Sequence, residues 1–279
     1  MNTTERYVLG APDPEMSRIE EILAENCLPF VHATQPNGER ADPRTAYNSD
    51  PRTFALPSVN LVLVEAGFAS NSSVNITDTI DHHNPGDPGY DADPKDSWHA
   101  SSLGQLMHRL NLVPTEDDML LGATDHNFAA TVNGLVEGVD PELALRYKAT
   151  GIAKTHGGTT EDVLREVSMY QATIANGGLV DIANGASVVD LRLVDIGEGT
   201  TTEYLAIQTA AAKLNVPVMV QSSNGPDSPG KIVLTGSVNE DTVRAFMTEW
   251  GPQNGLTDMY GVPSRGYGGG YIDNARIDV

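Results

Sequence analysis

The chain has 279 residues, of which 39% are hydrophobic, so it can bury a substantial core in one or two domains. Its 38 acidic and 17 basic residues give a net charge of −21, which argues against binding of long duplex nucleic acid. No apolar run approaches the ~20 residues that a membrane span needs. Cys27 is the only cysteine, which excludes an internal disulfide and thiolate metal clusters. We therefore expect a soluble, cytoplasmic protein, compatible with a homo-oligomer, whose metal ligands would be oxygen and imidazole groups.

The first half of the chain alternates between short apolar strands and amphipathic helices. Strands are predicted at 7–10, 29–33 and 59–65 and directly before residue 81, and helices at 15–26, 101–110, 116–130, 141–148 and 160–175. The run at 59–65 is almost continuously apolar, which is typical of a parallel strand covered on both faces. Residues 35–57 are polar and rich in proline, and a loop of this length tends to carry function. Candidate ligand contacts in and beside this loop are His32, Arg40, Arg44 and Tyr47.

The composition changes after residue 177. Strands are predicted at 187–192, 216–220 and 231–234, helices at 203–214 and 239–249, and a glycine-rich loop at 264–271. The predicted fold class is α/β, with a mainly parallel N-terminal sheet flanked by helices and a smaller C-terminal α/β domain. We place the domains at 1–177 and 178–279.

Carboxylate and imidazole groups recur just beyond the predicted strand ends. Asp81-His82-His83 follows an apolar, β-branched run and opens into a Pro/Gly loop, and comparable positions are held by Asp13 with Glu15, by Glu65, and by Asp125 with His126. Ligands of open α/β sheets bind in the crevice outside the carboxyl ends of the strands, so we expect these groups to converge. Carboxylates with histidine indicate a site for two divalent cations, which would activate water and bind phosphoryl oxygens.

Each element also has a simpler interpretation. The triplet at 81–83 could be a loop with two surface histidines, and Asp13 beside two prolines could be a helix N-cap. Glu65 and Asp125 could face solvent. Their common placement favours the metal site.

The chain resembles the DHH phosphoesterase superfamily over most of its length. Asp13-Pro14-Glu15 stands at the family's first motif, Asp-x-Asp, and Val64-Glu65 at the second, Val-Asp. Asp81-His82-His83 is the naming motif, and Ala123-Thr124-Asp125 is similar to the fourth motif. The segment from Gly268 to Ala275 is similar to the Gly-Gly-Gly-His…Ala-Ala signature of the DHH-associated C-terminal domain.

This resemblance implies Mn²⁺, one or two ions, or Mg²⁺ in its place. The implied metal ligands are Asp13, Glu15, Glu65, His82 and Asp125, with Glu65 bridging the two ions. Asp81 would orient His82, and His83 would contact the phosphoryl group. The glycine-rich segment would grip the substrate's phosphate or terminal nucleotide through Gly268, Gly269, Gly270 and Tyr271. Independently of the resemblance, Arg265 offers a bidentate phosphate donor. The simpler interpretation of this segment is a flexible C-terminal tail.

The chain departs from the family pattern at four positions. Leu9 stands where the family has a metal-binding histidine, Tyr271 replaces the histidine of the glycine signature, and Glu15 and Glu65 replace aspartates. A longer side chain shifts its oxygens by ~1.5 Å, more than the ~0.5 Å tolerance of a catalytic site. One metal position would then be shifted, weak or absent. Substitute ligands to consider are His32, His99 and His126.

The leading function is a Mn²⁺-dependent hydrolase, a phosphoesterase acting on a small nucleotide, dinucleotide or short oligonucleotide. The main alternative is a catalytically degenerate relative that binds a phosphorylated ligand or a metal without turnover. A third alternative is a structural or partner-binding role that uses neither.

Overall fold

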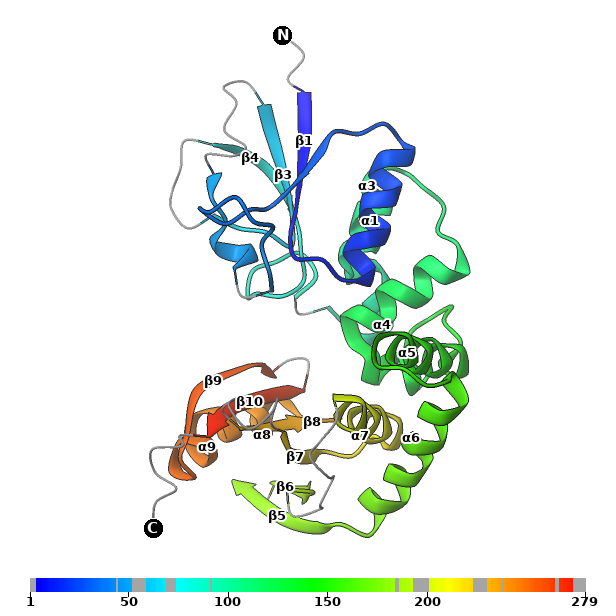
Figure 1. Cartoon of the computed structure of the whole chain (residues 1–279), viewed down its shortest axis with the longest axis vertical. Helices are drawn as coiled ribbons and strands as arrows, with labels where there is room; N and C mark the ends of the chain where they lie inside the picture. The colour runs from blue at the N-terminus through cyan, green and yellow to red at the C-terminus, as the bar shows by residue number, and fades with distance from the viewer. Residues whose placement is uncertain are drawn as a thin grey trace. The chain divides into compact units, whose positions relative to one another are not determined.

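The computed structural model describes residues 4–43, 45–51, 59–68, 74–90, 92–183, 186–192, 201–222, 230–236, 238–263 and 266–272. The chain forms two compact units (Figure 1), one of Met1–Asn127 with Val136–Val139 and one of Phe128–Leu135 with Asp140–Val279. Each unit combines one sheet with helices, which confirms the predicted α/β class. Within the described residues, no helix combines the length and the apolar character that crossing a bilayer requires.

The first unit is built on a four-stranded parallel sheet of order β2-β1-β3-β4. Its strands are β1 (Thr4–Leu9), β2 (Phe30–His32), β3 (Val59–Val64) and β4 (Asn75–Ile80). Its helical segments are α1 (Pro14–Glu25), η1 (Ala46–Asn48), η3 (Pro94–Asp96), α2 (Ser97–Ala100), α3 (Ser102–Arg109) and the start of α4 (Glu116–Val132). α4 loses helical geometry at Asn127, the last residue of the unit's first segment.

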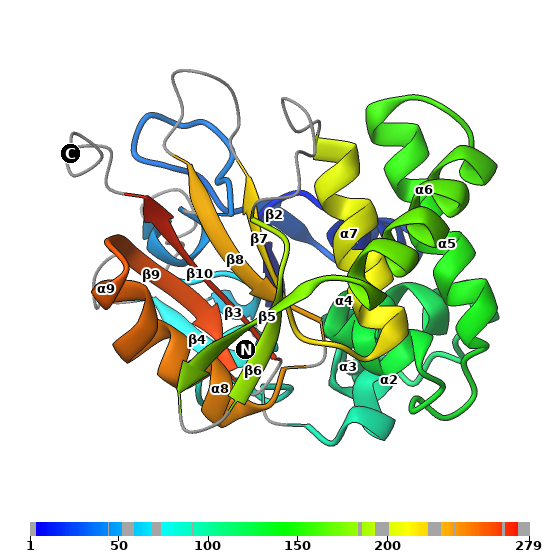
Figure 2. The same ribbon diagram turned by 90° about the horizontal axis from the view of Figure 1, so that it is seen from below.

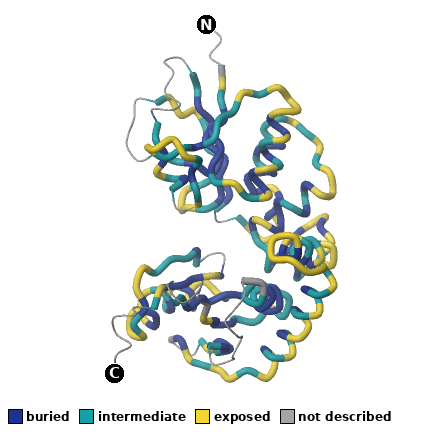
Figure 3. The backbone as a smooth tube through the Cα atoms, in the orientation of Figure 1, coloured by how far each residue is buried: buried dark blue, intermediate teal, exposed yellow. Residues whose placement is uncertain are grey.

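Both faces of this sheet are covered, as the apolar run at 59–65 predicts. Val8, Leu61 and Leu63 pack with small residues of the loops that follow β2 and β3. Their neighbours along the strands, such as Leu9 and Val62, are also fully buried and point to the opposite face, because strand side chains alternate. Figure 3 shows the resulting line of buried residues along the strands.

The second unit holds a six-stranded mixed sheet of order β5-β6-β7-β8-β10-β9 (Figure 2). Its strands are β5 (Gly178–Ala183), β6 (Ala186–Asp190), β7 (Val218–Ser222), β8 (Lys231–Thr235), β9 (Leu256–Val262) and β10 (Tyr267–Ile272). Its helices are α5 (Pro141–His156), α6 (Thr160–Ala175), α7 (Thr201–Leu214), α8 (Glu240–Ala245), the π-helical η4 (Phe246–Trp250) and α9 (Gly251–Gln253). One core joins α5, α6 and α7 to Val189 and Val218, and another joins α8 and η4 to Met219 and Leu234.

The compact units divide earlier in the chain than the predicted boundary at 177/178. Helices α5 and α6 belong to the second unit, because Ile152, Val163 and Val167 share a core with Ile207 of α7. The sequence of an amphipathic helix shows which of its faces is buried, but it does not show which sheet that face packs against.

The predicted glycine-rich loop is a strand in its described part. β10 pairs with β8 on one side and with β9 on the other, so Gly268–Gly270 lie inside the sheet. A Cβ atom at Gly269 would lie 2.5 Å from the ring of Tyr260, its partner on β9. An aromatic side chain that covers a strand glycine is a known stabilising device, and it explains why glycine occurs here in a strand.

The close approach of Gly10 to Glu65 provides a test of how tightly β1 and β3 are joined. A Cβ atom at Gly10 would lie 2.1 Å from the carbonyl oxygen of Glu65, so Gly10→Ala forces the backbone apart. We expect this substitution to lower the free energy of unfolding of the first unit by about 1–3 kcal/mol. Denaturant unfolding followed by circular dichroism measures the change.

Gly151→Ala in α5 is the matched control, because nothing lies within 4 Å of a Cβ atom there. Alanine is the better helix former, so this variant should gain about 0.5–1 kcal/mol. Equal stability of the Gly10→Ala protein and the wild type would contradict the tight packing.

Candidate metal centre

The segments that follow three of the strands carry most of the predicted site. Asp13 and Glu15 come after β1, Glu65 directly after β3, and the triplet at 81–83 directly after β4. These strands are neighbours in the parallel sheet, so their carboxyl ends meet at one edge. Asp125 joins them from α4, which confirms the helix predicted at 116–130, and the prediction that Asp125 follows a strand end is wrong.

The imidazole of His82 is the centre of the cluster. Its Nε2 atom lies 3.2 Å from Oε1 of Glu65, 3.5 Å from Oδ2 of Asp125 and 3.7 Å from Oε2 of Glu15. Ligand atoms of these four residues all lie within 4.8 Å of one another. His82 is fully buried, so the simpler interpretation of two surface histidines does not apply to it.

Glu15 is the most constrained carboxylate of the group. Its side chain is 0% exposed, and Oε1 accepts a hydrogen bond of 2.9 Å from the backbone N–H of Leu103, at the start of α3. Its Oε2 atom has no hydrogen-bond partner among the described residues. Burial, together with the charges of Asp125 and Glu65, raises the pKa of Glu15 well above its usual value. A buried oxygen without a donor, facing an imidazole, fits a bound cation.

Glu65 has a left-handed backbone, with φ of 48°. This conformation is unfavourable for a residue with a side chain, and such residues cluster at functional sites. The backbone N–H of Glu65 donates to the carbonyl of Ile80, which ties the end of β3 to the end of β4. The turn thus directs the Glu65 carboxylate toward His82 at a cost in backbone energy.

Asp81 serves as a hydrogen-bond hub beside the cluster. Its Oδ1 atom accepts from the backbone N–H groups of His82 and His83, from Nδ1 of His83 and from the hydroxyl of Tyr47. Burial alone would raise the pKa of Asp81, but the contacts with His83 and His82 hold it below its usual value. The ring that Asp81 contacts in these bonds is that of His83. The expectation that Asp81 orients the ring of His82 stays a prediction.

Asp13 is the N-cap of α1, as the simpler interpretation predicts. Its Oδ1 atom accepts a hydrogen bond of 2.6 Å from the backbone N–H of Met16. It is also electrostatically part of the cluster: burial and the charges of Asp125 and Glu65 raise its pKa to about 7. The pKa of Asp125 is instead lowered by His82, against the effect of burial.

The other candidate histidines lie in different surroundings. His32 is paired with Glu20 at 2.8 Å, and His99 lines a separate pocket. His126 is adjacent to the cluster: its ring stacks on His82 with centroids 5.1 Å apart, and its Nε2 donates to the carbonyl of Gly89. Leu9, at the position of the family's histidine, is part of the apolar core.

The other residues that were predicted to contact a ligand lie partly in the first unit and partly in the second. Tyr47 reaches the site through Asp81, whereas Arg40 lies 3.9 Å from Glu20. Gly268, Gly269, Gly270 and Tyr271 belong to strand β10 of the second unit. Arg44, Arg265 and the residues from 273 onward lie outside the described residues.

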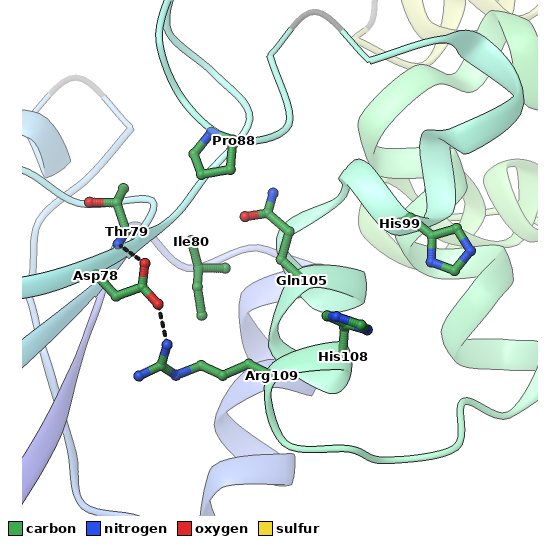
Figure 4. A pocket seen from close by; sticks show the side chains of 8 residues that line it. All are labelled: Asp78, Thr79, Ile80, Pro88, His99, Gln105, His108 and Arg109. Atoms are coloured by element: carbon green, nitrogen blue, oxygen red, sulfur yellow. Dashed lines mark hydrogen bonds and ion pairs between the residues drawn. The ribbon is translucent and has the colours of Figure 1, made fainter.

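Gln105 is a site residue that the sequence did not single out. Its Nε2 donates to the carbonyls of Asp81 and Ala100, and its Oε1 accepts from the N–H of Asp81. It therefore holds the backbone at the start of the triplet. A glutamine on an amphipathic helix carries no sequence signal for this role. Gln105 also lines a pocket of about 600 Å³ between β4 and α3, together with Ile80, Pro88 and Arg109 (Figure 4).

Comparison with known proteins found no family model that matches the chain and no curated protein similar to it in sequence. The chemistry of the cluster is therefore the basis for assigning a function. Four residues of the cluster offer three carboxylates and one imidazole, and this donor set suits a divalent cation bound by oxygen and nitrogen.

The substitution Glu15→Gln tests whether the cluster is electrostatically strained when no metal is bound. Gln keeps an acceptor for the N–H of Leu103 and removes the buried charge, so the metal-free protein should gain at least about 1 kcal/mol in unfolding free energy. Because the folded pKa of Glu15 is raised, the penalty is absent below the unfolded pKa and grows as the pH rises.

The gain should therefore be larger at about pH 8 than at about pH 5, as measured by thermal unfolding in the presence of a chelator. Glu249→Gln, an exposed position in the second unit, is the control and should change little. A loss of stability in the Glu15→Gln protein at both pH values would show that the cluster is not strained.

Proposed function

We propose that this chain is a divergent DHH-type phosphoesterase that uses divalent cations, preferably Mn²⁺, to hydrolyse a small phosphorylated compound. One observation carries the proposal: the buried Nε2 atom of His82 faces the carboxylates of Glu15, Glu65 and Asp125, and one buried oxygen of Glu15 has no hydrogen-bond partner within the part of the chain that the structure describes. A protein accepts such repulsion between buried charges where a ligand offsets it. Carboxylate and imidazole donors are consistent with Mn²⁺ or Mg²⁺.

The residues of the cluster have distinct roles in this proposal. Glu15, Glu65, Asp125 and His82 would hold the cation, which when bound lowers the pKa of water and polarises a phosphoryl oxygen. The N–H of Leu103 at the start of α3 holds the Glu15 carboxylate in place. The side chain of His83 is 37% exposed, and that of Asp125 30%, so this side of the cluster is open to a ligand.

The net charge of the protein favours a small substrate. With a net charge of −21, the surface repels long polyanions, whereas a bound cation dominates the field within a few ångströms of itself. A mononucleotide, a dinucleotide, a cyclic dinucleotide or pyrophosphate fits this condition better than a long nucleic acid.

A degenerate protein that binds a phosphorylated ligand without turnover is the second candidate. The burial of Leu9 in the core favours it, because that position offers no ligand atom to a second metal. Glu15 and Glu65 in place of aspartates favour it as well.

Hydrolysis assays with millimolar Mn²⁺ test the proposal. The wild-type protein should release phosphate or nucleoside monophosphate from at least one of these compounds, and a chelator should stop the reaction. His82→Ala and Glu15→Gln should lower the rate at least ~100-fold, because the first removes a ligand atom and the second replaces a charged ligand by a neutral one. Glu249→Gln should retain the wild-type rate.

Failure to hydrolyse any of the compounds, with Mn²⁺ bound at the cluster, would contradict turnover and support the degenerate protein. Failure to bind Mn²⁺ or any of the compounds, measured by calorimetry, would contradict both candidates. That result would favour a structural or partner-binding role.

A further inference from the structure

The ring of His126 packs against the face of His82, the imidazole at the centre of the cluster. The centroids of the two rings are 5.1 Å apart and their planes differ by 21°, which is a stacked arrangement. Both residues are buried, so the contact lies in the interior of the first unit. Stacked rings at this separation attract each other. His126 therefore limits the planes that the ring of His82 can adopt.

The contact arises because His126 directly follows a candidate ligand in α4. That ligand is Asp125, whose Oδ2 atom lies 3.5 Å from Nε2 of His82. Side chains of consecutive helical residues point about 100° apart, because a helix has about 3.6 residues per turn. One stretch of α4 thus supplies a carboxylate to the nitrogen edge of the His82 ring and an aromatic surface to its face.

A hydrogen bond holds the ring of His126 in turn. Its Nε2 atom lies 2.9 Å from the carbonyl oxygen of Gly89, and a carbonyl oxygen only accepts, so this nitrogen is the donor. Gly89 lies at the far end of the loop that begins with the triplet, and its N–H donates to the carbonyl of Asp81 at 3.0 Å. The loop closes on itself at this bond, and His126 is attached to the point of closure.

Gly89 also packs directly on the residue whose ring His126 covers. A Cβ atom at Gly89 would lie 2.8 Å from Cβ of His82 and 2.0 Å from the carbonyl oxygen of Ala100, so the backbone fits there only without a side chain. His126 therefore supports His82 in two ways. It contacts the ring itself, and through Gly89 it holds the backbone segment on which His82 rests.

We propose that His126 is a positioning residue of the metal centre, which orients the ring of His82 so that Nε2 points at the bound cation. The inference rests on the metal-dependent function proposed above. It gives His126 the task that the family resemblance assigns to Asp81. The side chain of Asp81 bonds to the ring of His83 and to the backbone N–H of His82.

The orientation of the His82 ring matters because its ligand atom lies away from the axis about which the ring turns. Nε2 is 3.2 to 3.7 Å from oxygens of three carboxylates, and a cation must fit among these four atoms. A functional site tolerates displacements of only ~0.5 Å or rotations of ~10–20°. A His82 ring without the stack would spend part of its time outside this range.

A simpler interpretation is that His126 only fills space in the core. Two substitutions separate the contacts of its ring. His126→Gln keeps an N–H donor at the distance of Nε2 and removes the ring from the face of His82. His126→Phe keeps a ring on that face and removes the N–H donated to Gly89. A residue that only fills space would leave the metal affinity of both folded variants unchanged.

Mn²⁺ binding to the full-length protein, followed by electron paramagnetic resonance, tests the inference. His126→Gln should bind Mn²⁺ ~10–100-fold more weakly than the wild type, as is typical when the outer partner of a metal ligand is removed. His126→Phe should bind at least ~3-fold more tightly than His126→Gln, because it restores the stack. His108→Gln, at an exposed position of α3, is the control and should bind as the wild type does.

Denaturant unfolding in the presence of a chelator separates a loss of structure from a loss of metal affinity. Folded His126→Gln and His126→Phe proteins that bind Mn²⁺ with wild-type affinity would overturn the inference. If His126→Gln does not fold, a crystal structure of the wild type with Mn²⁺ decides the question. The rings should remain stacked in it, whereas a His82 ring that binds the ion after turning away from His126 would overturn the inference.

The result is distinguishable from that of the hydrolysis assays. A wild type that binds Mn²⁺ but hydrolyses none of the compounds would refute the proposed function, and weaker binding by His126→Gln would still support the positioning role. A wild type that binds no Mn²⁺ would contradict both proposals.

Discussion

The repulsion among buried carboxylates around His82 is the constraint on which the first unit depends. Transfer of an ionised carboxylate from water into a protein interior costs several kcal/mol unless it is compensated. Glu15 is fully enclosed, Glu65 is 6% exposed, and both face the same imidazole nitrogen. When these carboxylates are ionised they repel one another unless a cation offsets their charge. Their convergence is therefore best explained by a bound cation.

Rigid elements hold the acids together against this repulsion. The strands β1, β3 and β4 are hydrogen-bonded neighbours, and their carboxyl ends fix the starting points of the three turns. Gly10 allows the turn at Glu65 to pack closely, and Glu65 accepts a left-handed backbone. The left-handed backbone of Glu65 lowers stability, and the close packing at position 10 restricts that position to glycine. Such costs are common where function requires a strained site.

Much of this site could be predicted from the sequence, because a parallel sheet brings strand ends together. Apolar runs at 7–10 and 59–65 and the β-branched run before residue 81 located the strands and therefore Glu15, Glu65 and His82. Asp125 was expected to follow a strand end but lies in α4, since a helix can bring a carboxylate to the same place. Gln105 had no signal at all, because its role depends on a tertiary contact with the backbone of Asp81.

The second unit was harder to predict for physical reasons. Three consecutive glycines in β10 suggested a loop, since glycine is depleted in strands, yet the ring of Tyr260 occupies the space that a side chain at Gly269 would fill. The strands β5 and β9 at the sheet edges were missed as well. Helices α5 and α6 were assigned to the first domain, although their apolar faces pack with α7.

An anomalous difference map from crystals soaked in Mn²⁺ tests the central claim most directly. The map should show a peak next to Nε2 of His82, coordinated by Glu15, Glu65 and Asp125, at the distances of ~2.0–2.2 Å that carboxylate and imidazole ligands adopt. Soaked crystals with no peak at this position, in which Oε2 of Glu15 remains without a partner, would contradict the claim that a cation explains the burial of these charges.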